Sequence, residues 1–102
     1  MIPNGIRPDV IVLKYIETVE SRKKCSATKD EILTDLDDTR TENAIRCLVR
    51  NKEIENETVP RKGVCSRYHL TEYGRNGLKL YAKCNVDEMR RIGEFLEQYF
   101  KE

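Results

Sequence analysis

The sequence has 102 residues, of which 38% are hydrophobic and 36% are charged, and its net charge is +1. This length suits one domain with a modest core, and the near-neutral charge excludes a strong overall attraction to nucleic acid. No run approaches the roughly 20 apolar residues of a membrane-spanning helix, and residues 1–5 lack the apolar segment of a signal peptide. We therefore expect a soluble, cytoplasmic protein.

The charges are unevenly distributed along the chain. Residues 26–38 carry one lysine and five carboxylates, whereas residues 39–67 have a net charge of +3. A local basic surface binds phosphate even when the total charge is near zero. The charged fraction also exceeds the roughly 25% of ordinary domains, which is typical of thermophile proteins with surface ion-pair networks.

The chain has one histidine, His69, and four widely spaced cysteines, Cys25, Cys47, Cys65 and Cys84. Because no two cysteines form a close Cys-x-x-Cys pair, the spacing disfavours a structural zinc site. Two other interpretations stay open for the cysteines: small buried hydrophobic side chains, or disulfides, which occur inside hyperthermophile cells. The sequence therefore predicts no metal site and no cofactor, and His69 is interpreted as a structural residue.

The first predicted helix covers about residues 9–21, after a loose arm formed by residues 1–7. Pro8 suits the first helical position, where a missing N–H costs nothing. Apolar residues then recur at helical spacing, at Val10, Ile11, Val12, Leu13, Ile16 and Val19.

A short strand is expected near residues 25–27, followed by a second helix over about 29–36. Thr28 and Glu31 have the spacing of a capping box, in which each side chain binds the backbone N–H of the other residue. The same spacing recurs at Thr39-x-x-Glu42, which predicts a third helix over about 39–51. The apolar face of this third helix consists of Ala44, Ile45, Leu48 and Val49.

A strand, a basic turn and a second strand are predicted over residues 54–59, 60–63 and 64–70. The second strand alternates apolar and polar residues, which is typical of a half-buried strand. Thr71 is expected to cap a fourth helix over about 72–84.

The last predicted helix begins at Asn85, which has Glu88 at capping-box spacing, and continues to the end of the chain. Apolar residues repeat three and four residues apart, as in a coiled-coil seam, at Met89, Ile92, Leu96 and Tyr99. We interpret this seam as a homodimer interface, with residues 1–84 as one domain and 85–102 as its dimerisation helix, and Cys84 as a candidate intersubunit disulfide near the dimer axis. The alternative is that the seam packs on its own domain.

The order of elements predicts an α+β, mostly α fold, a winged helix-turn-helix with a C-terminal dimerisation helix. Its third helix has an apolar face to hold it on the core and a polar face that fits the DNA major groove. The basic turn is expected to meet the DNA backbone or minor groove. The predicted DNA-binding residues are Arg40, Thr41, Asn43, Arg46, Arg50, Arg61, Lys62 and Arg67. The alternative is that the three arginines of the helix form a solvated face that makes ion pairs with Glu42, Asp38 or Glu53.

Two stretches resemble winged-helix transcriptional regulators of the MarR and PadR type, and small archaeal or archaeal-virus winged-helix DNA-binding proteins. The first stretch is the spacing from Leu48 to Ile54, and the second is Tyr68-His69-Leu70-Thr71-Glu72-Tyr73-Gly74. The resemblance covers roughly residues 8–84. It implies a DNA-binding transcription regulator that dimerises through terminal helices and acts in the host cell if the protein is viral.

Two other functions stay open beside that of a homodimeric regulator. The acidic strip Asp35–Asp38 would repel phosphate and suits a winged helix that docks another protein. A non-specific architectural chromatin protein is the third alternative. The sequence predicts no enzyme, because its single histidine has no neighbouring nucleophile motif and there is no glycine-rich phosphate loop; it also marks no small-molecule pocket.

Overall fold

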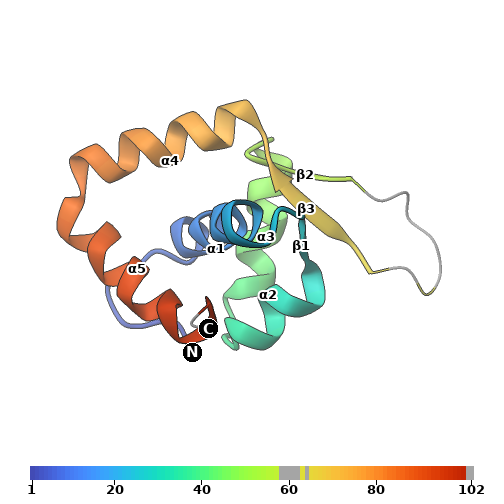
Figure 1. Ribbon diagram of the computed structural model, residues 1–102, viewed down its shortest axis with the longest axis horizontal. Coiled ribbons are helices and arrows are strands. Elements are labelled where there is room, and N and C mark those ends of the chain that lie inside the picture. The colour runs from blue at the N-terminus through green and yellow to red at the C-terminus, as the bar shows by residue number, and fades with distance from the viewer. Residues whose placement is uncertain (58–62, 64, 101–102) are drawn as a thin grey trace.

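The computed structural model describes residues 1–57, 63 and 65–100. Within these residues the chain forms five helices and one three-stranded antiparallel sheet. The expected α+β, mostly helical class is therefore confirmed (Figure 1).

Helix α1 (Pro8–Lys23) is the central element, and the other helices and the sheet lie around it (Figure 1). It begins at Pro8, as expected, and its backbone turns left-handed at Lys24, with φ of 56°. A helix with apolar residues on more than one side is stable only when it is covered from several directions. All the predicted apolar positions of this helix are buried, and Tyr15 is buried with them.

Strand β1 (Ala27–Thr28) leads directly into helix α2 (Lys29–Asp35). The predicted capping box is present: the backbone N–H of Glu31 donates to the Thr28 hydroxyl at 3.1 Å, and the Glu31 carboxylate accepts from the backbone N–H of Thr28 at 3.2 Å. These local bonds satisfy the first free N–H groups of the helix.

Helix α3 (Thr41–Arg50) begins two residues later than predicted, because Thr39 does not cap it. Asp38 holds the turn instead, with its carbonyl accepting from the backbone N–H of Thr41 at 3.1 Å. The Thr41 hydroxyl is buried and donates to the carbonyl of Leu36 at 2.7 Å. The turn between α2 and α3 is therefore fixed by contacts within residues 36–41.

Strands β2 (Ile54–Asn56) and β3 (Arg67–Leu70) are shorter than predicted, and the sheet order is β1-β3-β2. Tyr68 lies opposite Asn56 on one side and Ala27 on the other. Tyr68 and Leu70 are buried, so the predicted alternation identifies the inner face of β3.

Helix α4 (Glu72–Cys84) has the predicted bounds, and the Thr71 hydroxyl accepts from the backbone N–H of Gly74 at 3.0 Å. Gly74 lies directly against the backbone of Glu53, since a Cβ atom built there would be 2.0 Å from the Glu53 carbonyl oxygen. Close backbone packing thus explains why this helix contains a glycine in its first turn.

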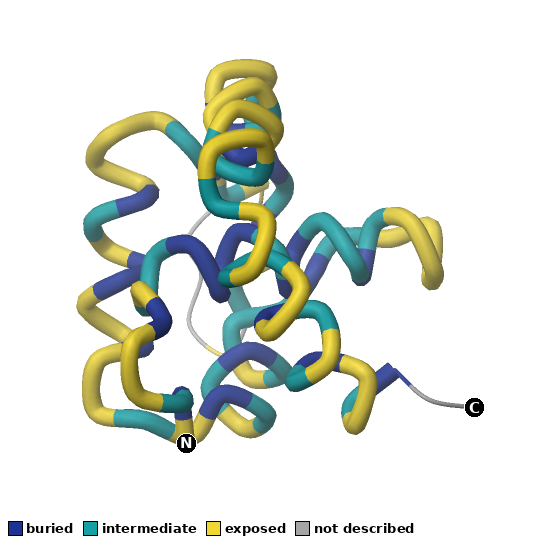
Figure 2. The backbone as a smooth tube through the Cα atoms, turned by 90° about the vertical axis from the view of Figure 1, so that its left-hand side faces the viewer, coloured by how far each residue is buried: buried dark blue, intermediate teal, exposed yellow. Residues whose placement is uncertain are grey.

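Helix α5 (Val86–Phe100) folds back onto α1 and completes the same core. Ile92 and Leu96 are buried, and the ring centroid of Phe100 lies 5.1 Å from that of Tyr15. Figure 2 shows the buried segments gathered inside the molecule, with exposed backbone around them.

The N-terminal segment is packed, and the prediction of a loose arm was wrong. Ile2 and Ile6 are 1% and 3% exposed. The backbone N–H of Ile2 donates to the Asp38 carboxylate at 3.0 Å, and the Arg91 guanidinium donates to the Asn4 carbonyl at 3.1 Å. Two apolar side chains and these long-range bonds are sufficient to hold the arm on the core.

Candidate nucleic-acid interface

Helix α3 rests on the core by one face and presents the other to solvent. Ala44, Ile45 and Leu48 are buried, whereas Asn43, Arg46 and Arg50 are exposed. Because these exposed residues are three and four positions apart, they lie in one line along the helix. The line is formed by the amide and guanidinium groups that hydrogen-bond the edges of bases and phosphates.

Arg46 shares a carboxylate with a lysine of the preceding helix. Its guanidinium Nη2 lies 3.1 Å from Glu42 Oε1, and the Lys29 ammonium lies 3.7 Å from the same oxygen. The Arg46 side chain is 71% exposed, so this ion pair is in contact with water and contributes little to stability. Glu42 is therefore a counterion that a phosphate group can replace.

Arg40 is bound more firmly. Its Nε and Nη2 atoms each lie 2.9 Å from one oxygen of the Asp38 carboxylate, a two-pronged ion pair. The Asp38 side chain is only 7% exposed and also accepts from the backbone N–H groups of Arg40 and Ile2. These bonds, led by that of the Arg40 side chain, hold the pKa of Asp38 well below its usual range. Asp38 is thus a structural partner of Arg40.

The other predicted DNA-binding residues have different positions. Thr41 is fully buried, so it cannot reach DNA and is removed from the set. The Arg50 guanidinium donates to Cys47 Sγ at 3.3 Å, and the exposed Arg67 donates to the Ser26 carbonyl at 3.5 Å. Arg61 and Lys62, the predicted tip of the turn, lie outside the described residues.

A concave surface of about 300 Å³ separates α3 from the sheet. Its floor is apolar, since Ile45 and Tyr68 line it together with the 39% exposed side chain of Val49. Its rim is polar, with Lys29, Glu42, Arg46, Arg50 and Asn56. Lys29 belongs to this surface although its sequence position predicts only a helix start, because the tertiary fold brings the beginning of α2 beside α3.

A cross-strand cluster on the sheet was also missed from the sequence. His69 on β3 lies between Glu55 of β2 and Glu57, the residue that follows this strand, with Nδ1 at 3.0 Å from Glu57 and Nε2 at 3.6 Å from Glu55. Hydrogen bonds from Ser26 and then His69 lower the pKa of Glu57. The alternation of the strands is the signal that predicts such neighbours, once the register is known. The position of His69 between these two carboxylates is consistent with the interpretation of His69 as a structural residue.

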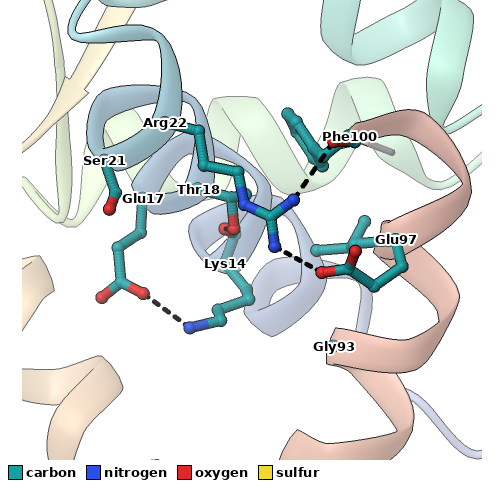
Figure 3. Close-up of a pocket in the computed structure, with 9 residues that line it drawn as sticks. Lys14, Glu17, Thr18, Ser21, Arg22, Gly93, Glu97 and Phe100 are labelled. Atoms are coloured by element: carbon teal, nitrogen blue, oxygen red, sulfur yellow. Dashed lines mark hydrogen bonds and ion pairs between the residues drawn. The ribbon is translucent and has the colours of Figure 1, made fainter. Parts of the chain in front are cut away.

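A second cavity, of about 340 Å³, lies between α1 and α5 (Figure 3). Its charged side chains are already paired: Lys14 binds Glu17 at 2.7 Å, and Arg22 binds Glu97 and the carbonyl of Phe100. Figure 3 shows the Arg22 guanidinium reaching across the opening toward α5. Since these groups are satisfied by one another, the cavity is a joint between two helices rather than a site with polar groups directed at a ligand.

The predicted dimer seam is largely used within the chain. Ile92 and Leu96 are buried in the core of their own chain, so they cannot also contact a second copy, whereas Met89 and Tyr99 keep partial exposure. Ile92 and Leu96 therefore pack on their own domain, as in the alternative interpretation of the seam. Residues 86–100 complete the core instead of forming a separate unit.

All four cysteines are free thiols in the structure, and none of them is buried. Cys25 and Cys84 are exposed, which excludes the interpretation of these two as core side chains. Within the described ranges no three His, Cys, Asp or Glu side chains are grouped so that they could hold a metal ion. None of the described helices is long and apolar enough to cross a membrane.

Comparisons of the chain with protein-family models, with curated proteins and with solved structures found no match. The resemblance to winged-helix regulators therefore depends on the sequence motifs alone and stays a prediction.

Proposed function

We propose that the chain is a sequence-specific double-stranded DNA-binding transcriptional regulator. In this proposal α2 and α3 form a helix-turn-helix, and β2 and β3 form the wing beside it. The observation that carries the proposal is the exposed line of Asn43, Arg46 and Arg50 on a helix whose opposite face is buried.

The chemistry of the line matches the major groove. Arginine binds the O6 and N7 acceptors of guanine with two hydrogen bonds, and asparagine binds N6 and N7 of adenine in the same way. A helix held on a rigid core presents these groups with little loss of conformational entropy. We therefore assign base contacts to Asn43 and Arg46, and a phosphate contact to Arg50.

The ion pairs of the free protein determine which basic side chains are available to bind DNA. Arg40 is held by the nearly buried Asp38, so we assign it a supporting role at the start of α3. Glu42 competes with DNA for Arg46 and Lys29. Glu42 therefore lowers the affinity of both side chains for DNA until a phosphate or a base replaces it.

The sheet adds backbone contacts in this proposal. Arg67 is exposed on the middle strand β3, and the predicted basic tip at Arg61 and Lys62 belongs to the connection between β2 and β3. Cations at such positions meet phosphates or the minor groove and fix the orientation of the reading helix.

The test begins with selection of bound duplexes from a random-sequence pool, followed by titration of the enriched duplex. We expect Arg46→Ala to weaken binding by about 1–3 kcal/mol, the cost of losing a base contact. Arg90→Ala is the matched control, because Arg90 is an exposed arginine on α5 that pairs with Asp87 of the same helix. Glu42→Gln should strengthen binding, and all affinities should fall with added salt as counterions are released.

Equal binding by wild type, Arg46→Ala and Arg90→Ala would contradict the base contact. Enrichment of no sequence, with salt-dependent coating of every duplex, would instead support the architectural alternative. A sequence with two half-sites would show that two copies bind together.

A second candidate function is the docking of another protein on the same surface. The observation that favours it is Val49, which is 39% exposed beside the apolar floor formed by Ile45 and Tyr68. A surface that binds only phosphate groups does not require exposed apolar side chains. Failure of all duplexes to bind at low salt would favour this candidate.

A further inference from the structure

An apolar stripe on α4 is left uncovered by the described residues of the chain. Of the described residues, five large hydrophobic side chains are exposed, and three of them lie on α4 or the first residue of α5. Tyr73, Leu80 and Val86 are 67%, 64% and 66% exposed. Figure 1 shows α4 along one edge of the molecule, where it contacts α1, α5 and β3.

The positions on α4 have the spacing of a helix-packing seam. Tyr73, Gly77, Leu80 and Cys84 are four, three and four residues apart, and all four are exposed. This pattern places them on one side of the helix, as in an antiparallel or parallel helix pair. The buried residues of α4, Gly74 and Leu78, lie outside this stripe.

We propose that this stripe is the surface on which a second copy of the chain docks, with its own α4 antiparallel to the first. A two-fold axis makes one surface serve both copies. In the antiparallel alignment Leu80 of one copy lies over Gly77 of the other, so that a large side chain fills the space above a residue without one. Tyr73 of each copy lies over Cys84 of the other.

The charges beside the stripe favour the antiparallel direction. Glu72 lies in the first turn of α4 and Lys83 in the last, and no ion pair among the described residues uses either of them. Antiparallel helices bring Glu72 of one copy near Lys83 of the other at both ends of the seam. In a parallel pair Glu72 and Lys83 lie at opposite ends of the seam, about 16 Å apart along the axis, and cannot pair.

The stripe is short, and its length sets the expected strength. It spans about 16 Å along the helix at 1.5 Å per residue, whereas a stable interface buries about 800 Å² on each partner. The dimer is therefore reversible and depends on concentration. It is independent of the proposed DNA contact, since α4 carries none of the residues assigned to DNA.

The arrangement changes the expectation for Cys84. The two Cys84 residues lie at opposite ends of an antiparallel seam, about 16 Å apart along the axis. A disulfide requires Cα atoms within about 7 Å, so the Cys84 residues of the two copies cannot form a disulfide with each other. Each Cys84 instead faces Tyr73 of the other copy.

Sedimentation equilibrium over a concentration series tests the surface. Leu80→Glu should weaken dimerisation at least about tenfold, because it places a charge in the apolar centre of the seam. Lys79→Glu is the control: this neighbour is exposed on α4 but points away from the stripe, so its dimerisation should equal that of the wild type. A wild type that stays monomeric up to about 1 mM, or a Leu80→Glu variant that dimerises as well as the wild type, would overturn the proposal.

Disulfide trapping tests the direction of the helices. Mild oxidation of Tyr73→Cys should give a covalent dimer, and peptide mapping should find the new cysteine joined to Cys84. Asn76→Cys, an exposed α4 position beside the stripe rather than on it, should give much less of this product. A covalent dimer joined through two Cys84 residues in the wild type would show parallel helices and overturn the antiparallel arrangement.

Discussion

Asp38 connects the N-terminal segment to the start of α3 through one carboxylate. It accepts from the backbone of Ile2 in the N-terminal segment, and from the backbone and side chain of Arg40 at the start of α3. The sequence indicates only that Asp37 and Asp38 end a helix and would repel phosphate. The structure separates the two residues, because Asp37 is exposed whereas Asp38 is nearly covered.

Asp38→Asn should lower the free energy of unfolding at pH 7, since the amide keeps the shape but loses the charge. The pKa of Asp38 is depressed in the folded protein. Its contribution is therefore fully present above the pKa of an aspartate in the unfolded chain, about 4, and is lost as the pH falls through the folded pKa. Urea titrations should show the difference between wild type and variant shrinking below pH 4. Asp37→Asn should show no such difference at any pH.

At the scale of elements, local sequence signals identify the helices but not always their ends. Thr28 and Thr71 cap the helices that follow them, whereas Thr39 has the same capping-box pattern and caps nothing. The capping box expected at Asn85 is also replaced, because the Glu88 carboxylate binds the Tyr81 hydroxyl and the backbone of Arg7. At Asn85 the capping pattern fails because other partners bind the Glu88 carboxylate.

The two glycines of α4 should respond in opposite ways to alanine. Gly74→Ala should cost more than about 2 kcal/mol, because the added Cβ would meet the Glu53 carbonyl oxygen at 2.0 Å and force backbone to move. Gly77→Ala should stabilise the protein by up to about 1 kcal/mol through helix propensity, since its nearest neighbour is 4.0 Å away. Chemical unfolding at low protein concentration measures both. Equal effects would show that propensity, rather than close packing, governs position 74.

At the scale of the whole molecule, the two ends of the chain cover the central helix. The N-terminal segment contributes Ile2 and Ile6 to the core, and α5 contributes Ile92, Leu96 and Phe100. Arg91 of α5 also binds the carbonyl of Asn4. Removing either end is therefore expected to expose one side of α1.

Ile2→Ala should cost about 2–4 kcal/mol, as for other buried aliphatic side chains, although the residue is next to the chain end. Val86→Ala is the control, since Val86 is 66% exposed and surface changes are usually within about 0.5 kcal/mol. Thermal or urea unfolding checks both. A stability of Ile2→Ala equal to that of the wild type would mean that the first residues do not belong to the cooperative core.

The sequence by itself determined the order and type of the elements and the inner faces of α1, α3 and β3. These features depend on side-chain periodicity and on caps within four residues, so α4 could be predicted to the residue. The candidate site was predictable as far as the exposed Asn43, Arg46 and Arg50, for the same reason.

Only the tertiary structure decided which partner each exposed group has. It placed Lys29 and Glu42 beside Arg46, Asp38 on Arg40, and Ile92 and Leu96 of the α5 seam in the core of their own chain. An apolar stripe in the sequence predicts that one face of a helix is buried, but it does not identify the surface that buries it. The hydrophobic effect is non-directional, so any apolar surface could do so. The choice depends on which surface the fold brings near, and among the described residues the exposed side chains of Tyr73 and Leu80 lie on α4, whereas Ile92 and Leu96 of α5 are buried.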